Sequence, residues 1–268
     1  MHKVEPKPDW PDSWKSSYTY DLLEVYGEIS RRGYAYAYQN RQNYALEALR
    51  AISTPGERIL DVAAAQGNFS LLLAEMGYEV VWNDLRSELK DYVELKREKG
   101  NVEYRVGNIF DFSDANEFDA ILATEIIEHV AHPDQFLKKL AFLLKPSGHI
   151  ILTTPNGEYF RNNLPKFSDC PDPSQFESIQ FKPNSDGHIF LFYPDEIQKL
   201  AQVTGLQLKE LKLFTNPLTA GHIKLELLLK SFPRKAVNFL ESITQLQSGF
   251  PFRRLNVHLL AVLQKPKT

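Results

Sequence analysis

Short apolar runs alternate with helical patterns through the middle of the chain. The predicted strands cover residues 57–63, 78–84, 101–108, 118–124 and 148–154. Apolar positions at helical spacing lie between them and predict helices over residues 69–76, 85–99 and 134–144. This alternation indicates parallel strands joined by crossover helices, an arrangement that places ligands at the carboxyl ends of the strands.

The pattern changes on both sides of this region. Residues 1–19 are rich in proline and tryptophan and predict an arm laid over the surface, and residues 20–50 predict two helical segments, the first capped by Asp21. Beyond residue 154 we expect the following segments in chain order: a proline-rich lid, a helix from Pro194, a strand over 206–214, a helical stretch over 223–246 and a strand over 254–264.

The predicted fold class is α/β. We expect a Rossmann-like, seven-stranded, mostly parallel sheet with helices on both faces and an antiparallel hairpin at its C-terminal end. The expected organisation is an N-terminal arm and helical cap over 1–50 and one α/β domain over 51–268, with a lid at 155–188 and a helical insertion at 216–253.

Composition narrows the class of protein. The 268 residues are 43% hydrophobic and 24% charged, which is typical of globular proteins, and no apolar run is long enough to span a membrane. The N-terminal stretch lacks the apolar segment of a signal peptide, so we expect a cytoplasmic protein without a membrane span. The single cysteine, Cys170, excludes an internal disulfide and a cysteine-rich zinc site.

Charge is distributed unevenly along the chain. The formal net charge of −3 argues against binding of nucleic acid by bulk phosphate neutralisation. Residues 211–268, however, contain nine basic residues and only two acids, Glu226 and Glu241, so this segment has a net charge of +7. This basic segment either receives an anionic substrate or forms a solvated face.

The strongest chemical signal is the sequence ILDVAAAQGNF, followed about 20 residues later by VVWNDL. It places Asp61 at the end of one strand, a turn of small residues before a helix, and Asp84 at the end of the next strand. Small residues let the backbone approach a ligand, and the Asp84 carboxylate can accept both hydroxyls of a ribose. A nicotinamide-dependent oxidoreductase would need G-x-G-x-x-G, which is absent here.

These motifs resemble those of the class I S-adenosylmethionine-dependent methyltransferases. The family's acid-x-Gly-x-Gly-x-Gly line reads Asp61-x-Ala63-x-Ala65-x-Gly67 here, and alanine fits these two positions if their φ angles are negative and a methyl group has clearance. VGNIFDF, FDAILATEIIEHV and LLKPSGHIILTTPN match later motifs, the second as found in the ubiquinone-biosynthesis-like O-methyltransferases. The resemblance implies S-adenosylmethionine as cofactor and the following binding residues: Arg41 at the methionine carboxylate, Asp61, Ala63, Gly67, Asp84, Leu85, Asn108 at the adenine amino group, Ile109 and Phe110 beside the ring, Thr124 and Glu125.

A cluster of acids and histidines follows the fourth strand. Glu125, Glu128 and His129 have spacings of three and four residues, which places them on one side of a helical turn. With His188 beyond the lid they resemble the divalent-metal ligands of small-RNA 3′-end methyltransferases and of some quinone O-methyltransferases. The same residues also occur in metal-free relatives, where the counterparts of Glu128 and His129 hold a loop together. The sequence therefore leaves two alternatives for these residues, a divalent-metal site and a structural role.

Without a metal, His129 or His188 is the candidate general base, because a histidine pKa suits removal of a hydroxyl proton. Arg31 and Arg32 are candidates for contact with an anionic acceptor. The predicted activity is methyl transfer from S-adenosylmethionine to a small-molecule hydroxyl. The alternatives are a methyltransferase acting on RNA 3′ ends or another macromolecule, and a non-catalytic protein that binds S-adenosylmethionine.

Overall fold

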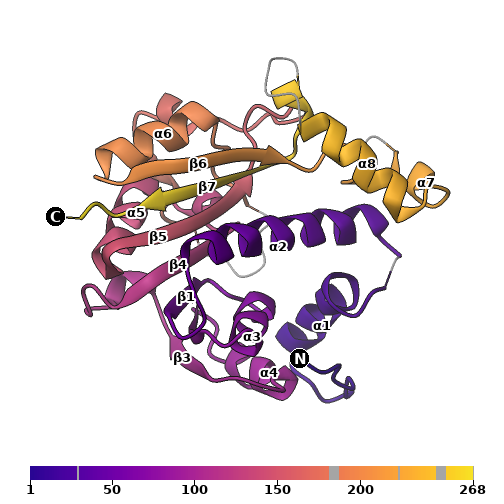
Figure 1. Ribbon diagram of the computed structural model, residues 1–268, viewed down its shortest axis with the longest axis horizontal. Helices are drawn as coiled ribbons and strands as arrows, with labels where there is room; N and C mark the ends of the chain where they lie inside the picture. The colour runs from indigo at the N-terminus through magenta and orange to yellow at the C-terminus, as the bar shows by residue number, and fades with distance from the viewer. Residues whose placement is uncertain (29, 181–186, 223, 246–251, 268) are drawn as a thin grey trace.

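A computed structural model describes residues 1–28, 30–180, 187–222, 224–245 and 252–267. Seven strands form one sheet in the order β3-β2-β1-β4-β5-β7-β6 (Figure 1). The strand bounds are β1 Arg58–Val62, β2 Glu79–Asp84, β3 Val102–Val106, β4 Phe118–Thr124, β5 Leu144–Pro155, β6 Gln207–Phe214 and β7 His258–Gln264. Strands β1 to β5 pair in parallel, and β7 pairs antiparallel with both β5 and β6. The predicted fold class is confirmed.

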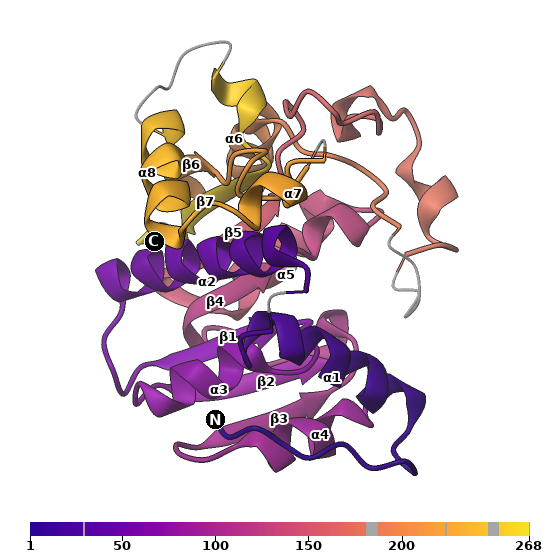
Figure 2. The ribbon, with the colours of Figure 1, turned by 90° about the vertical axis from the view of Figure 1, so that its right-hand side faces the viewer.

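Helices cover both faces of the sheet (Figures 1 and 2). The helix bounds are α1 Asp12–Glu24, α2 Arg32–Ile52, α3 Asn68–Glu75, α4 Leu89–Lys96, α5 Pro133–Leu143, α6 Pro194–Val203, α7 Glu226–Leu229 and α8 Arg234–Gln245. One apolar cluster joins α2 and α3 to one face, and another joins α5 and α6 to the opposite face. Alternate residues of the central strands feed the two clusters, for example Leu122 and Ile121, which fixes the register of the sheet.

The N-terminal helix differs from the prediction. Asp21 lies in the last turns of α1, which begins at Asp12, and it does not cap a helix. Its buried carboxylate accepts hydrogen bonds from Lys96 Nζ (2.7 Å), Tyr92 Oη (2.7 Å) and Asn68 Nδ2 (2.8 Å). Because these partners lie on α3 and α4, the network fixes α1 against the start of α3.

The segment between β6 and β7 is docked onto α2. The Glu226 carboxylate at the start of α7 accepts hydrogen bonds from the backbone N–H groups of Arg32 and Gly33, at 2.8 Å each. Arg32 Nη1 donates in return to the carbonyl oxygens of Leu229 (3.0 Å) and Lys230 (3.1 Å). Arg32 therefore anchors α7 through its Nη1 group, and the contact of Arg31 and Arg32 with an anionic acceptor stays a prediction.

The proline-rich segment after β5 contains two short 3₁₀ turns, η3 Phe167–Asp169 and η4 Pro173–Phe176. His132 Nε2 and the Glu177 carboxylate lie 2.7 Å apart, which ties this segment to the start of α5. Residues 181–186 of the predicted lid lie outside the described residues. The predicted domain bounds stay a prediction.

No helix within the described ranges has the length and apolar character needed to cross a bilayer. A cytoplasmic location stays a prediction.

Candidate functional site

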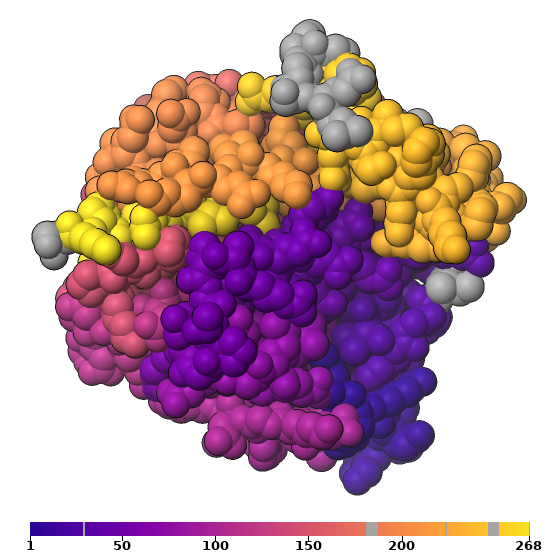
Figure 3. All heavy atoms as spheres, viewed as in Figure 1, coloured from indigo at the N-terminus to yellow at the C-terminus, as the bar shows by residue number. Residues whose placement is uncertain are grey.

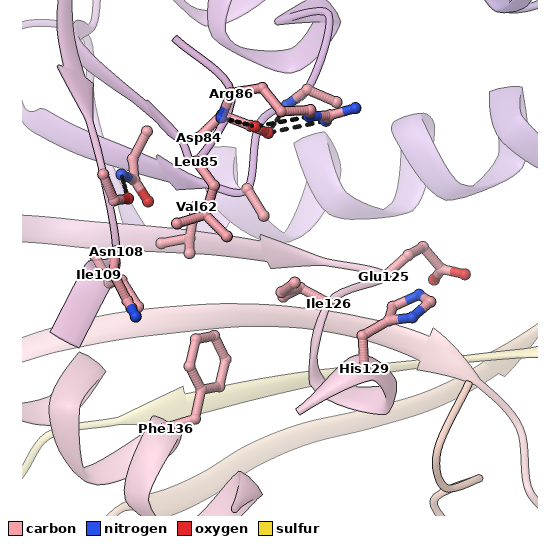
Figure 4. A pocket seen from close by; sticks show the side chains of 14 residues that line it. Val62, Asp84, Leu85, Arg86, Asn108, Ile109, Glu125, Ile126, His129 and Phe136 are labelled. Atoms are coloured by element: carbon pink, nitrogen blue, oxygen red, sulfur yellow. Dashed lines mark hydrogen bonds and ion pairs between the residues drawn. The ribbon is translucent and has the colours of Figure 1, made fainter. Parts of the chain in front are cut away.

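A cavity of about 400 Å³ opens at the carboxyl ends of β1, β2 and β4. It is lined by Val62, Ala63, Ala65, Asn83, Asp84, Leu85, Arg86, Gly107, Asn108, Ile109, Glu125, Ile126, His129 and Phe136. Figure 4 shows Asn108, Ile109 and Phe136 toward one end of the cavity and Glu125 and His129 at the other. Its size and its position beyond the parallel strands are those expected of a nucleoside-sized ligand site.

The turn between β1 and α3 has a left-handed backbone at three positions. The φ angles are +52° at Ala63, +48° at Ala65 and +70° at Gly67. The negative φ angle under which alanine would fit is therefore found at neither position, and the left-handed backbone costs roughly 1–2 kcal/mol at each alanine. At Gly67 a Cβ atom would lie 2.7 Å from Val93 Cγ1, so only glycine fits there. The turn keeps the conformation of a glycine-rich loop although two of its glycines are replaced.

Asp84 lies at the end of β2 and is 4% exposed. Its carboxylate accepts hydrogen bonds from the backbone N–H groups of Ala65 and Arg86, both at 2.9 Å, and from the Arg86 guanidinium at 2.9 and 3.1 Å. Two backbone donors fix the carboxylate at the cavity wall. Arg86 lines the same cavity and was not found by sequence reasoning, although it stands two residues beyond Asp84.

Asn108 caps the short turn η1 Ile109–Asp111, because its Oδ1 accepts a hydrogen bond from Phe110 N at 3.1 Å. Ile109 and Phe136 line the cavity beside it, whereas Phe110 packs against Phe136 at a centroid separation of 6.5 Å. This end of the cavity combines an apolar wall with an amide side chain, which suits a planar base with an exocyclic amino group.

Glu125 follows β4 with a left-handed backbone, φ +52°. Its carboxylate accepts a hydrogen bond from Thr153 Oγ1 (3.0 Å) and lies 3.4 Å from Arg41 Nη1 and 4.0 Å from His258 Nε2. Burial opposes ionisation, but the charges of Arg41 and His258 outweigh it and lower the pKa of Glu125. A strained backbone that holds an ionised acid at a cavity wall is typical of a functional site.

Arg41 of α2 is predicted to hold the methionine carboxylate of the cofactor. Its guanidinium lies 5.1 Å from the centroid of the Tyr38 ring, and its Nε is a buried donor without a hydrogen-bond partner. The charges of Glu125 and Glu24 outweigh burial and raise the pKa of Arg41. A buried guanidinium with one unused N–H group can donate a hydrogen bond to an additional carboxylate.

Glu128, His129 and His188 come together at the end of the cavity that Glu125 and His129 line, called the reaction end below. One ligand atom from each residue lies within 4.8 Å of the others, and the two imidazole rings are 4.9 Å apart by centroid. The backbone explains the proximity of His188, since Ile189 N donates to the Glu128 carbonyl oxygen at 2.7 Å. The structure thus joins three of the four predicted metal ligands, while Glu125 pairs with Arg41.

Glu128 is completely buried. Its Oε2 accepts a hydrogen bond from Thr154 Oγ1 at 2.9 Å, and its Oε1 has no hydrogen-bond partner. Burial and the neighbouring charge of Glu125 raise the pKa of Glu128 well above its ordinary value. An orphaned carboxylate oxygen beside two imidazoles matches the donor set of a divalent transition metal.

Other residues near the reaction end were missed by sequence reasoning. His258, at the start of β7, is 9% exposed and stacks on Phe214 at 5.4 Å, and burial lowers its pKa to about 4. Tyr159 Oη and His222 Nδ1 lie 2.8 Å apart. His258 begins a terminal apolar strand and His222 lies in the insertion, so neither falls within a motif of the first 190 residues.

The predicted cofactor residues fall into two groups. Those that line the cavity are Ala63, Asp84, Leu85, Asn108, Ile109 and Glu125. Arg41, Asp61, Gly67, Phe110 and Thr124 are not among the residues that line it. Asp61, for example, accepts a hydrogen bond from Ser70 Oγ at 2.6 Å and so fixes the start of α3.

Comparison with known proteins gives one consistent result. A family model described as a methyltransferase domain matches residues 34–211. The ubiquinone biosynthesis O-methyltransferase of Xanthomonas campestris pv. campestris (strain B100) is 28% identical over 191 residues, which cover 62% of this chain and 80% of that protein.

Two solved structures share the fold. The phosphoethanolamine N-methyltransferase 2 of Haemonchus contortus, in complex with S-adenosyl-L-methionine, has a TM-score of 0.60 at 19% identity, covering 94% of this chain and 57% of that one. An S-adenosylmethionine-dependent methyltransferase from Mesorhizobium loti has a TM-score of 0.55 at 15% identity, covering 81% and 96%. At these identities the likeness concerns the fold alone.

Proposed function

Because this chain belongs to the methyltransferase-domain family and is an S-adenosylmethionine-dependent class I methyltransferase, we propose that it methylates a hydroxyl group of a small molecule. The observation that carries this proposal is the position of His129 in the cavity wall beside Glu125 (Figure 4). His129 Nδ1 lies 3.2 Å from the carbonyl oxygen of Gly187. Since a carbonyl only accepts, Nδ1 carries the proton of the neutral ring and the basic lone pair is on Nε2.

The residues at the cavity suit the cofactor. Asp84 would accept hydrogen bonds from the ribose hydroxyls, Asn108 would contact the adenine amino group, and Ile109 would cover the ring. Arg41, whose buried Nε is a donor without a hydrogen-bond partner, would hold the methionine carboxylate. Glu125 and His129 lie at the end of the cavity opposite Asn108 (Figure 4).

When bound, the cofactor would supply an electrophilic methyl group for an in-line displacement. The acceptor oxygen would take up this methyl group as the carbon–sulfur bond breaks, and the electron pair of that bond would stay on sulfur. His129 Nε2 would accept the hydroxyl proton. Alignment of acceptor and methyl group supplies most of the acceleration, and the base adds roughly 10²–10⁴-fold. We assign His188 the role of positioning His129, whose ring it contacts at 4.9 Å.

The donor set also fits a divalent cation. Glu128, His129 and His188 would hold it, and the cation would supply Lewis-acid activation of the acceptor hydroxyl. Because the pKa of Glu128 is raised by burial and by the charge of Glu125, the residue must release a proton to become a ligand. In that case His129 is a ligand, and removal of the hydroxyl proton falls to another group.

The basic C-terminal segment supports a proposal about the charge of the acceptor. We propose an anionic acceptor, because residues 211–268 hold nine basic residues and two acids, and both acids are turned inward onto backbone N–H groups. The Glu128, His129 and His188 cluster with this basic segment also favours a second candidate, an RNA 3′ end or another polyanion. Phosphate contacts would then make binding decrease steeply with salt concentration.

Methyl transfer from labelled S-adenosylmethionine to three acceptor classes tests the proposal: neutral phenols, carboxylated phenols and an RNA oligonucleotide. We expect transfer to a phenol, with greater turnover for a carboxylated one. His129→Asn should lower kcat by roughly 10²–10⁴-fold and leave the affinity for S-adenosylmethionine unchanged. Transfer to the RNA alone, or full turnover by His129→Asn, would contradict the proposal.

A further inference from the structure

Five large apolar side chains lie exposed on α7, α8 and the turn between them. They are Leu227, Leu228, Phe232, Phe239 and Ile243, and they form the outer ridge of the molecule at this end. Phe239 is 66% exposed and Leu227 is 67% exposed. The described ranges contain fifteen large exposed apolar side chains, and five of them lie within the 17 residues of this ridge. Exposed apolar side chains are therefore concentrated here. Clusters of this kind mark interaction surfaces.

The buried and exposed positions of α8 show that Phe239 and Ile243 point away from the body of the molecule. Val237 is completely buried and Glu241 is 6% exposed, and these two residues are four apart on the inner side of the helix. Phe239 lies midway between them in sequence and therefore about 200° around the helix, with Ile243 one turn further along the same outer side. Figure 3 shows α7 and α8 at the upper right margin of the molecule.

Acidic and basic side chains lie on different sides of the lobe formed by residues 216–253. Its two acids, Glu226 and Glu241, turn inward and accept hydrogen bonds from backbone N–H groups. Glu226 accepts from Arg32 and Gly33, and Glu241 accepts from Thr215 and Asn216. The exposed charges next to the ridge are Lys224, Lys230 and Lys235. The ridge is apolar, it is flanked by lysines, and both acids of the lobe point inward. Such a face complements a surface that has an apolar interior and a negatively charged outer layer.

We propose that the outer ridge docks the enzyme onto an anionic lipid surface. Phe239, Ile243 and the leucines of α7 enter the boundary between headgroups and acyl chains, while the lysines contact lipid phosphates. A second copy of the chain is a poorer occupant, because a two-fold contact through this ridge would bring the same lysines together without acids to pair with them.

Docking leaves the catalytic end of the molecule intact. The lobe is already fixed to α2 by Glu226 and Arg32, and the same helix carries Arg41 of the cofactor site. The whole enzyme therefore adopts one orientation on the surface. The inference is independent of the acceptor, because it needs only the fold and the exposed side chains.

Vesicle flotation of the full chain tests this docking. Vesicles of phosphatidylcholine are compared with vesicles that also contain phosphatidylglycerol, at low and high salt. We expect binding to the anionic vesicles, weakened by salt. The double variant Phe239→Ser/Ile243→Ser should lower the partition coefficient about tenfold or more, and each of Lys224→Gln, Lys230→Gln and Lys235→Gln should lower it about fivefold.

Val203→Ser is the matched control, since Val203 is 65% exposed on α6 outside the ridge, and its partition should be unchanged. Thermal melts and S-adenosylmethionine binding of each variant establish that the fold is retained. Absence of binding to anionic vesicles by the wild type overturns the proposal. It is equally overturned if the ridge variants bind as tightly as the wild type, or if they convert a dimer to a monomer while no form binds lipid.

Discussion

Lys96 and Asp21 form a completely buried ion pair with a separation of 2.7 Å between Nζ and Oδ2. Lys96 Nζ also donates to Asn68 Oδ1 at 2.7 Å, directly after the left-handed Gly67. The pair therefore joins α1, α4 and the first residue of α3 behind the cofactor turn. Burial outweighs the attraction of Asp21 and lowers the pKa of Lys96, so the two charges depend on each other.

Removal of one partner should be costly. Lys96→Met leaves the Asp21 carboxylate buried without its cation, and we expect the free energy of unfolding to decrease by about 3–5 kcal/mol. The double variant Asp21→Asn/Lys96→Met removes both charges and should recover part of that loss. Urea denaturation of both variants measures the difference. A single variant as stable as the wild type would show that the pair does not hold the N-terminal helix in place.

The left-handed alanines make a second prediction. Ala65→Gly relieves a strained φ of +48°, a gain of about 1–2 kcal/mol that the greater freedom of glycine in the unfolded chain partly offsets. We expect the variant to be as stable as the wild type or more stable. The matched control is Ala37→Gly within α2, which should lose about 1 kcal/mol. Equal losses at the two positions, measured by denaturation, would contradict the strain.

Asp61 gives a pH dependence with a definite sign. Burial raises its pKa to about 7, so the folded protein binds a proton that the unfolded chain, with a pKa of 3.8, has already released. The resulting contribution of Asp61 to the free energy of unfolding is fully present below pH 4 and is lost as the pH rises through 7. Asp61→Asn cannot ionise, so its stability relative to the wild type should increase by roughly 2–4 kcal/mol between pH 4 and pH 8. A difference that is constant with pH would contradict the raised pKa.

A cation at Glu128, His129 and His188 is testable without turnover. If the cluster binds a divalent metal, Mn²⁺ or Zn²⁺ should raise the melting temperature, more at pH 8 than at pH 6, because Glu128, whose pKa is raised, binds the metal only after releasing its proton. Glu128→Gln should abolish this shift while leaving S-adenosylmethionine binding unchanged. Identical shifts in the wild type and Glu128→Gln would assign the metal to another place.

Much of the fold follows from local patterns. Strands β1, β2 and β4 are short, mostly buried runs between turn residues, and their parallel pairing follows from the alternation with helices. Asp84 was predicted at the cavity because it ends a parallel strand, whereas Asn108 and Glu125 were implied by the resemblance to the methyltransferase motifs. All three line the cavity.

The remainder depends on contacts between distant segments. Arg32 and Glu226 are 194 residues apart, and only the docking of α7 on α2 shows that Arg32 is already bound. His258 reaches Glu125 because β7 inserts between β5 and β6, a pairing that the pattern of β7 does not specify. The turn imposes positive φ angles at Ala63 and Ala65 against the preference of alanine, and the sequence pattern does not reveal this.

The central claim is that the cavity beside Asp84 binds S-adenosylmethionine, and titration calorimetry of the wild type and Asp84→Ala tests it most directly. The predicted result is micromolar binding by the wild type that Asp84→Ala weakens about tenfold or more, because the variant removes charge-assisted hydrogen bonds to the ribose. Absence of binding by the wild type, or equal affinity in the variant, would contradict the account.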